Sequence, residues 1–155
     1  MKIAIVLALV PAVIGVFWAC SRKPAAPSTE IGLSGTERVR FMQYLAEGRR
    51  LYSIYCSNCH QSDGSGLKRL YPSLRGSDFL KTRAEATICG IRFGMEGNTA
   101  EDGVRYPQVM PANPSLSDLE IAELATFVYY EFAGEVTTWT PQAIRQILSD
   151  CDAKH

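Results

Sequence analysis

The 155-residue sequence contains only two histidines, His60 and His155, and His155 is its last residue. A structural zinc site normally takes four cysteine or histidine ligands, often supplied as two separate pairs. One close pair, Cys56 and Cys59, precedes His60, and no comparable second pair accompanies it. This shortage of ligands argues against a zinc-binding module.

The sequence also lacks an excess of either charge, because 16 lysines and arginines balance 16 aspartates and glutamates. A basic surface for nucleic acid is therefore not expected. Internal repeats and low-complexity tracts are missing too, and the length suits one ordinary domain. We place this domain at residues 36–155 and expect no nucleic-acid partner.

Clear alternation of polar and apolar residues is lacking, so the sequence predicts no strand. Helical spacing of apolar residues occurs instead in four segments, at residues 36–56, 77–93, 116–134 and 140–151. The third segment opens with Ser117 and Glu120 in the pattern of a capping box, and Gly134 marks its end. Thr140 and Pro141 suit the start of the fourth. The predicted fold class is all-α with long loops.

A long apolar run is present only at the N-terminus, at residues 3–19. It is short for a spanning helix and contains Pro11 and Gly15, so residues 1–19 are predicted to be an export signal peptide. A small residue followed by Cys20 resembles a bacterial lipoprotein signal, in which Cys20 would be acylated. An uncleaved anchor, or a signal with an incidental Cys20, stays open as an alternative.

The next segment, residues 20–35, is rich in proline, alanine and serine and is predicted to be a flexible tether. Together the signal and the tether predict an exported domain, held by lipid on the periplasmic side of a bacterial membrane. The expected partners are redox proteins at that membrane, with no small-molecule substrate.

The pentapeptide Cys56-Ser-Asn-Cys59-His60 is the strongest chemical signal in the sequence. A dithiol–disulfide switch usually starts a helix in an alternating strand–helix fold, which this pattern does not predict. In an exported protein, C-x-x-C-H is the signature of covalent haem c attachment. Two thiols one helical turn apart can each bond one vinyl group of a single haem, and the adjacent histidine can ligate the iron.

From Gly48 to Phe132 the sequence resembles a class I monohaem c-type cytochrome. Gly48 and Tyr52 match a glycine and an aromatic in the family's first helix, and Phe127 matches the aromatic that packs there. The resemblance implies helices wrapped around one covalently bound haem. This chain continues further than the family commonly does, so an extra C-terminal helix is expected.

The segment Tyr71–Phe79 resembles the family's P-x-L-x-G motif. In that motif the proline carbonyl accepts a hydrogen bond from the proximal histidine. The resemblance therefore implies that Pro72 orients His60, a role that fixes the imidazole tautomer. A simple turn proline is the alternative.

The second axial ligand has three methionine candidates, Met42, Met95 and Met110. Met42 lies on the predicted first helix and is assigned to the core. The family's distal methionine typically precedes the last helix and is often followed by proline, which Met110-Pro111 matches. Met110 is therefore the expected iron ligand, and Met95 is expected to pack against the haem or fill a gap.

For several other residues the sequence does not indicate a single role. Arg92, Tyr106 and Asn113 are candidates for contact with haem propionates or with the methionine loop, and Trp139 suits packing or an interface. The segment around residues 96–108 is longer than the family's and is expected to form an extra loop over the haem edge.

Two cysteines remain once Cys20 is assigned to lipid and Cys56 with Cys59 to haem, namely Cys89 and Cys151. In an oxidising compartment they would form a disulfide between the central and the extra helix. Two buried free thiols are the alternative.

Histidine–methionine ligation leaves the iron without an open position and favours electron transfer over catalysis. The expected function is that of a membrane-tethered carrier of single electrons between respiratory-chain components, not an enzyme. The alternatives are a fixed haem c subunit of a larger oxidase, reductase or dehydrogenase, and a haem-based gas sensor or peroxidase.

Overall fold

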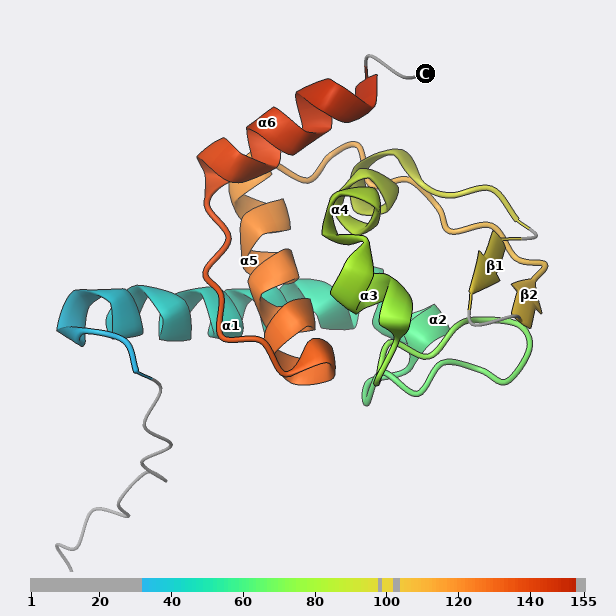
Figure 1. Ribbon diagram of the computed structural model, residues 1–155, viewed down its shortest axis with the longest axis horizontal. Coiled ribbons are helices and arrows are strands. Elements are labelled where there is room, and N and C mark those ends of the chain that lie inside the picture. The colour runs from blue at the N-terminus through green and yellow to red at the C-terminus, as the bar shows by residue number, and fades with distance from the viewer. Residues whose placement is uncertain (1–31, 98, 102–103, 153–155) are drawn as a thin grey trace, which may run out of the picture. The chain divides into compact units, whose positions relative to one another are not determined.

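The computed structural model describes residues 32–97, 99–101 and 104–152 (Figure 1). The expected signal peptide, Cys20 and the tether up to residue 31 lie outside these residues. Within the described residues, no helix combines the length and the apolar character needed to cross a membrane. The elements, in chain order, are α1 (Gly35–Tyr55), α2 (Ser57–His60), α3 (Asp78–Thr82), α4 (Ala84–Phe93), β1 (Thr99–Glu101), β2 (Val104–Tyr106), α5 (Asp118–Val128), the π-helical turn η1 (Tyr129–Ala133) and α6 (Pro141–Asp152). The predicted all-α class is confirmed, since strands in the described part of the chain form only one small two-stranded sheet.

Helix α1 crosses α5 at a glycine, and this crossing is the largest helix–helix contact of the fold (Figure 1). A Cβ atom placed on Gly48 would lie only 2.7 Å from Cβ of Phe127 and would also collide with the Glu123 carbonyl. The rings of Tyr52, Phe127 and Phe132 then pack around the crossing, with centroids 5.2–5.9 Å apart. The expected Gly48–Phe127 packing is therefore confirmed.

The buried face of α1 differs from the predicted one. Its buried residues are Phe41, Gly48, Leu51 and Tyr52. Met42, which we assigned to the core, is 50% exposed, so that assignment is wrong. Apolar residues occupy more than one face of this helix, and the position of α5, which the sequence does not give, selects the face that is buried.

The predicted helix at residues 77–93 is divided into α3 and α4. Arg83 leaves the helical conformation, with φ −133° and ψ 50°. Ser77 begins α3 by accepting a hydrogen bond from the amide of Leu80. Helix α4 then buries Ile88, Gly90 and Ile91, which places its C-terminal half in the core.

Helix α5 begins with the predicted capping box. The amide of Glu120 donates to Ser117 Oγ at 3.3 Å, and the Glu120 carboxylate accepts from the Ser117 amide at 2.8 Å. The α-helix ends at Val128 and continues as η1, whose Phe132 is buried. Gly134 ends the segment in the left-handed conformation, φ 75°, as the sequence predicts.

Helix α6 packs on both α4 and α5, so that α5 lies between α1 and α6 (Figure 1). Thr140 caps it by accepting from the amide of Ala143, and Ile144 is fully buried. Cys151 is joined to Cys89 of α4 in a disulfide, with 6.1 Å between the two Cα atoms. The extra helix is therefore part of the domain core.

The segment expected to be a loop without strands contains an antiparallel hairpin, in which Thr99 pairs with Tyr106 and Glu101 with Val104. The prediction that the sequence contains no strand is wrong here, because strands of three residues are too short to show alternation. In the sequence, Asp102-Gly103 separates the two strands. This dipeptide is typical of two-residue hairpin loops, and it could have indicated the strand pair.

Replacing Gly48 by alanine tests the crossing. Helix propensity alone favours alanine by about 1 kcal/mol. The added Cβ would meet backbone and Cβ atoms that cannot move independently of α5, so we expect a net loss of about 1–3 kcal/mol in the free energy of unfolding. Denaturant unfolding measures this loss. Gly35→Ala, at an open position on the same helix, is the matched control, and equal stability of the two variants would contradict the close crossing.

Removing Cys89 and Cys151 together, as the double alanine variant, tests the disulfide. The bond closes a loop across 62 positions, so the chain-entropy model gives a loss of about 4 kcal/mol at most. Denaturant unfolding of the variant, and of the parent with and without dithiothreitol, measures it. Alkylation of the unreduced, denatured parent at two cysteines would show that the bond does not form.

Candidate haem site

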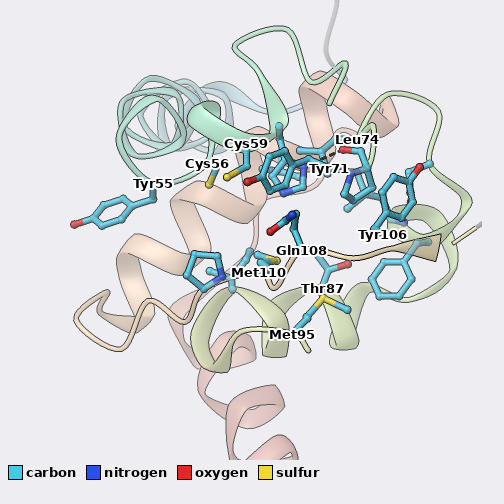
Figure 2. Close-up of a pocket in the computed structure, with 18 of the residues that line it drawn as sticks. Tyr55, Cys56, Cys59, Tyr71, Leu74, Thr87, Met95, Tyr106, Gln108 and Met110 are labelled. Atoms are coloured by element: carbon cyan, nitrogen blue, oxygen red, sulfur yellow. Dashed lines mark hydrogen bonds between the residues drawn. The ribbon is translucent and has the colours of Figure 1, made fainter. Parts of the chain in front are cut away.

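One pocket brings together the site residues that the sequence predicts. Cys56, Cys59, His60, Pro72, Met95 and Met110 all line it. The space between these residues, with its open mouth included, is about 1140 Å³. Figure 2 shows Cys56 and Cys59 on one side of the pocket, with Met110 and Met95 on the other. Most of the remaining lining is apolar or aromatic.

The C-x-x-C-H motif forms the junction of α1 and α2. Cys56 stands between the two helices, and its amide donates to the Tyr52 carbonyl at 3.0 Å. The amides of Cys59 and His60 both donate to the Cys56 carbonyl, at 3.1 and 3.0 Å. This single turn presents both thiols to the pocket, and neither thiol is in a disulfide.

The thiol of Cys56 does not have the character of a redox-active dithiol. Burial, with a smaller contribution from Cys59, raises the pKa of Cys56 to about 12. Catalytic C-x-x-C motifs instead lower the pKa of their nucleophilic cysteine. The local environment thus agrees with the sequence argument against a dithiol switch.

His60 is oriented by a single backbone contact. Its Nδ1 lies 3.0 Å from the Pro72 carbonyl oxygen. Because a carbonyl can only accept, Nδ1 carries the hydrogen and Nε2 keeps its lone pair. Burial lowers the pKa of His60, which the bond to Pro72 partly opposes, and the neutral imidazole is the form that binds a metal.

The Pro72 carbonyl is itself held in place by the loop that follows the motif. The amide of Leu67 donates to the Tyr71 carbonyl at 3.0 Å, and the amide of Gly66 donates to the His60 carbonyl at 2.9 Å. Gly66 has φ +67°, and a Cβ there would lie 2.5 Å from the Pro72 oxygen. The contact of Gly66 with the Pro72 carbonyl was not foreseen, because it depends on how the loop folds back on itself.

Met110 and Met95 lie opposite each other in an isolated antiparallel bridge. Met110 is followed by Pro111, and Asn113 Nδ2 donates to the carbonyl of Ile91 at 3.0 Å and to that of Pro111 at 3.4 Å. Asn113 therefore contacts the methionine loop, one of the two roles considered for it. The bridge between the two methionines was not foreseen, because a single pair of residues has no sequence period.

The remaining candidates fall into different places. Tyr106 lines the pocket, whereas Arg92 is not among the lining residues. Arg92 donates instead to the Pro114 carbonyl at 3.0 Å and to Asp118 at 3.3 Å, and so connects α4 to the start of α5. Trp139 packs on Tyr129, with ring centroids 5.5 Å apart, which agrees with the expected packing role.

These residues fit a haem. The pocket has a mostly apolar lining, as a porphyrin requires, and two free thiols line it one turn apart. The imidazole of His60 keeps the lone pair of Nε2, and the thioethers of Met95 and Met110 lie opposite the two thiols (Figure 2). This donor set, one histidine with methionine, is the one that c-type cytochromes use for the iron.

Comparison with known families identifies the kind of domain. Residues 43–128 match the family described as cytochrome C oxidase, cbb3-type, subunit III. The chain belongs to this family of c-type cytochrome domains. It therefore contains a c-type cytochrome domain, and the class I resemblance is confirmed.

Two relatives illustrate the range of proteins that carry such a domain. The chain is 31% identical over 105 residues to the fructose dehydrogenase cytochrome subunit of Gluconobacter japonicus. The aligned region covers 65% of this chain and 22% of that protein. It is 30% identical over 87 residues to cytochrome c-552 of Thermus thermophilus, covering 54% of this chain and 66% of that protein. The chain thus spans less than two thirds of either relative.

Proposed function

We propose that the protein carries single electrons through one haem c, bound covalently at Cys56 and Cys59 and ligated by His60 and Met110. The observation that carries this proposal is the 3.0 Å contact between His60 Nδ1 and the Pro72 oxygen. This contact orients the imidazole within a pocket that Met110 also lines. Each thiol would add across one vinyl group, with sulfur bonded to one vinyl carbon and the thiol hydrogen transferred to the other.

The side chains contribute orientation and tuning to electron transfer. A haem, when bound, supplies the one-electron Fe(III)/Fe(II) couple. His60 donates from Nδ1 to Pro72, which keeps Nε2 available and its direction constant. The Met110 thioether is a soft ligand that favours the ferrous state and raises the reduction potential. With His60 and Met110 both bound to the iron, no position would be left for oxygen or a substrate.

The location that we propose is the periplasmic side of a bacterial membrane. This is supported by the apolar run at residues 3–19, by Cys20 as the acylated residue, and by the tether after it. A flexible segment of this length has an r.m.s. reach of roughly 20 Å, so the domain would stay close to membrane partners. Proximity would then raise the effective concentration of the cytochrome at those partners.

A second setting for the same chemistry is a fixed subunit of a larger complex. It is favoured by two names, those of the matched family and of the Gluconobacter relative, since each describes a subunit of an oxidase or a dehydrogenase. The name of the Thermus relative instead describes a cytochrome alone. Our first proposal remains a carrier that moves between respiratory-chain components, with the docked subunit as its alternative.

Replacing Met110 by alanine tests the ligand set. Ferric haem with a methionine ligand has a weak sulfur-to-iron band at the red end of the visible spectrum, and we expect Met110→Ala to abolish it and to lower the reduction potential. Met42→Ala, at an exposed methionine, is the control and should leave both unchanged. An unchanged band in Met110→Ala would refute Met110 as ligand. Absence of the band from the parent would favour the gas sensor or peroxidase with an open position.

Purification after mild solubilisation distinguishes a mobile carrier from a fixed subunit of a complex. A mobile carrier should leave the membrane fraction as a single haem protein, and Cys20→Ser should release it without detergent. Constant co-purification with an oxidase or dehydrogenase, in fixed ratio and resistant to salt, would show a docked subunit. Mass spectrometry of the parent also reports whether Cys20 is acylated.

A further inference from the structure

Met95 and Met110 form a reciprocal backbone pair. The Met95 amide donates to the Met110 carbonyl at 2.9 Å, and the Met110 amide donates to the Met95 carbonyl at 3.0 Å. Residues directly opposite in an antiparallel pair place their side chains on the same face. Both side chains accordingly line the haem pocket. The direction in which Met110 leaves the backbone is therefore set by its pairing with Met95.

The sulfur atoms of Met95 and Met110 both lie close to Gly90 of α4. A Cβ atom on Gly90 would be 2.8 Å from the sulfur of Met95 and 3.9 Å from that of Met110. The missing side chain at Gly90 is thus what makes room for the Met95 thioether. The thioethers of Met95 and Met110 thus approach the same residue of α4.

Gly94 and Asn113 hold the same segment against the C-terminal end of α4. At Gly94, φ is +81°, and a Cβ there would lie 2.7 Å from the Met110 oxygen and 2.9 Å from the Ala112 amide nitrogen. The Asn113 amide donates to the carbonyls of Ile91 and Arg92, at 3.2 Å each. The backbone around Met110 is therefore fixed on both sides, which leaves the side-chain rotamer as its main freedom.

We propose that Met95 is a positioning residue for Met110: its thioether, seated on Gly90, holds the Met110 sulfur in the direction of the iron. The inference rests on the proposed ligation by Met110. It assigns Met95 a task that needs an apolar side chain of this length but no bond from its own sulfur to the metal. Preorganisation of this kind strengthens a ligand bond because less side-chain freedom is lost when the bond forms.

Competition with imidazole tests this task on the ferric holoprotein. Free imidazole can replace Met110 at the iron, and its apparent affinity rises as the fraction of molecules with a displaced methionine rises. We expect Met95→Ala to keep the sulfur-to-iron band at room temperature but to bind imidazole about tenfold more tightly, an effect the size of an ordinary core truncation. Met95→Leu, which keeps most of the volume, should behave like the parent.

A second pair of variants uses the space at Gly90. Gly90→Ala would displace the Met95 sulfur and should also raise imidazole affinity. In the double variant Gly90→Ala/Met95→Ala, the new methyl group enters the space that the thioether vacates. The gain in imidazole-binding free energy of the double variant should therefore be smaller than the sum of the gains of the two single variants. Such non-additivity indicates direct coupling between the two residues.

Global unfolding, monitored by far-ultraviolet circular dichroism, distinguishes a positioning role of Met95 from a packing role. A residue that only packs would lower the unfolding midpoint and leave imidazole affinity and reduction potential at the parent values. That result for Met95→Ala would overturn the inference while Met110 stays the ligand. Loss of the band in both Met95→Ala and Met95→Leu would show that Met95 itself ligates the iron and would overturn it too. A band that survives Met110→Ala would refute the ligand assignment and this inference with it.

Discussion

The close crossing of α1 and α5 at Gly48 is the constraint on which the rest of the domain depends. Helix α1 ends directly before Cys56, and α5 begins shortly after the Met110 segment, so this one contact sets the separation of the two sides of the pocket. It works because Gly48 presents no side chain to the Phe127 turn of α5. The aromatic rings of Tyr52, Phe127 and Phe132 then fill the space around the crossing, and their burial stabilises it.

Helix α4 serves as the platform for the opposite side of the pocket. Its C-terminal half accepts hydrogen bonds from Asn113 and leaves room at Gly90 for Met95. The additional helix α6 braces this platform through Cys89–Cys151, one residue from Gly90. Asp118 adds a polar connection, since it pairs with Arg92 of α4 and with Arg145 of α6. The extension beyond the family's usual last helix thus supports the part of the fold that carries the methionines.

Much of the fold and of the site was predictable where a signal lies within a few residues. The capping box of α5, the left-handed Gly134 and the Cys56–His60 turn are local, because each depends on hydrogen bonds between near neighbours in the chain. The missed pairing of β1 with β2 is local but too short to show a period, whereas the error at Met42 concerns a contact between distant segments. Met42 has a helical spacing suitable for burial, yet α5 covers another face of α1. Arg92, which the sequence left as an open candidate for a propionate, donates to Asp118 from a distant segment.

By itself, the sequence determined the kind of chemistry: two thiols and an imidazole within five residues suit one haem, and glycine and proline spacings indicated where helices start and end. Only the tertiary structure decided which atoms surround that chemistry. The pairing of Met95 with Met110, and the space for a sulfur atom over Gly90, depend on how α4, the hairpin and the segment before α5 pack together. Such contacts join segments far apart in the chain, and no local period in a single sequence encodes their distance.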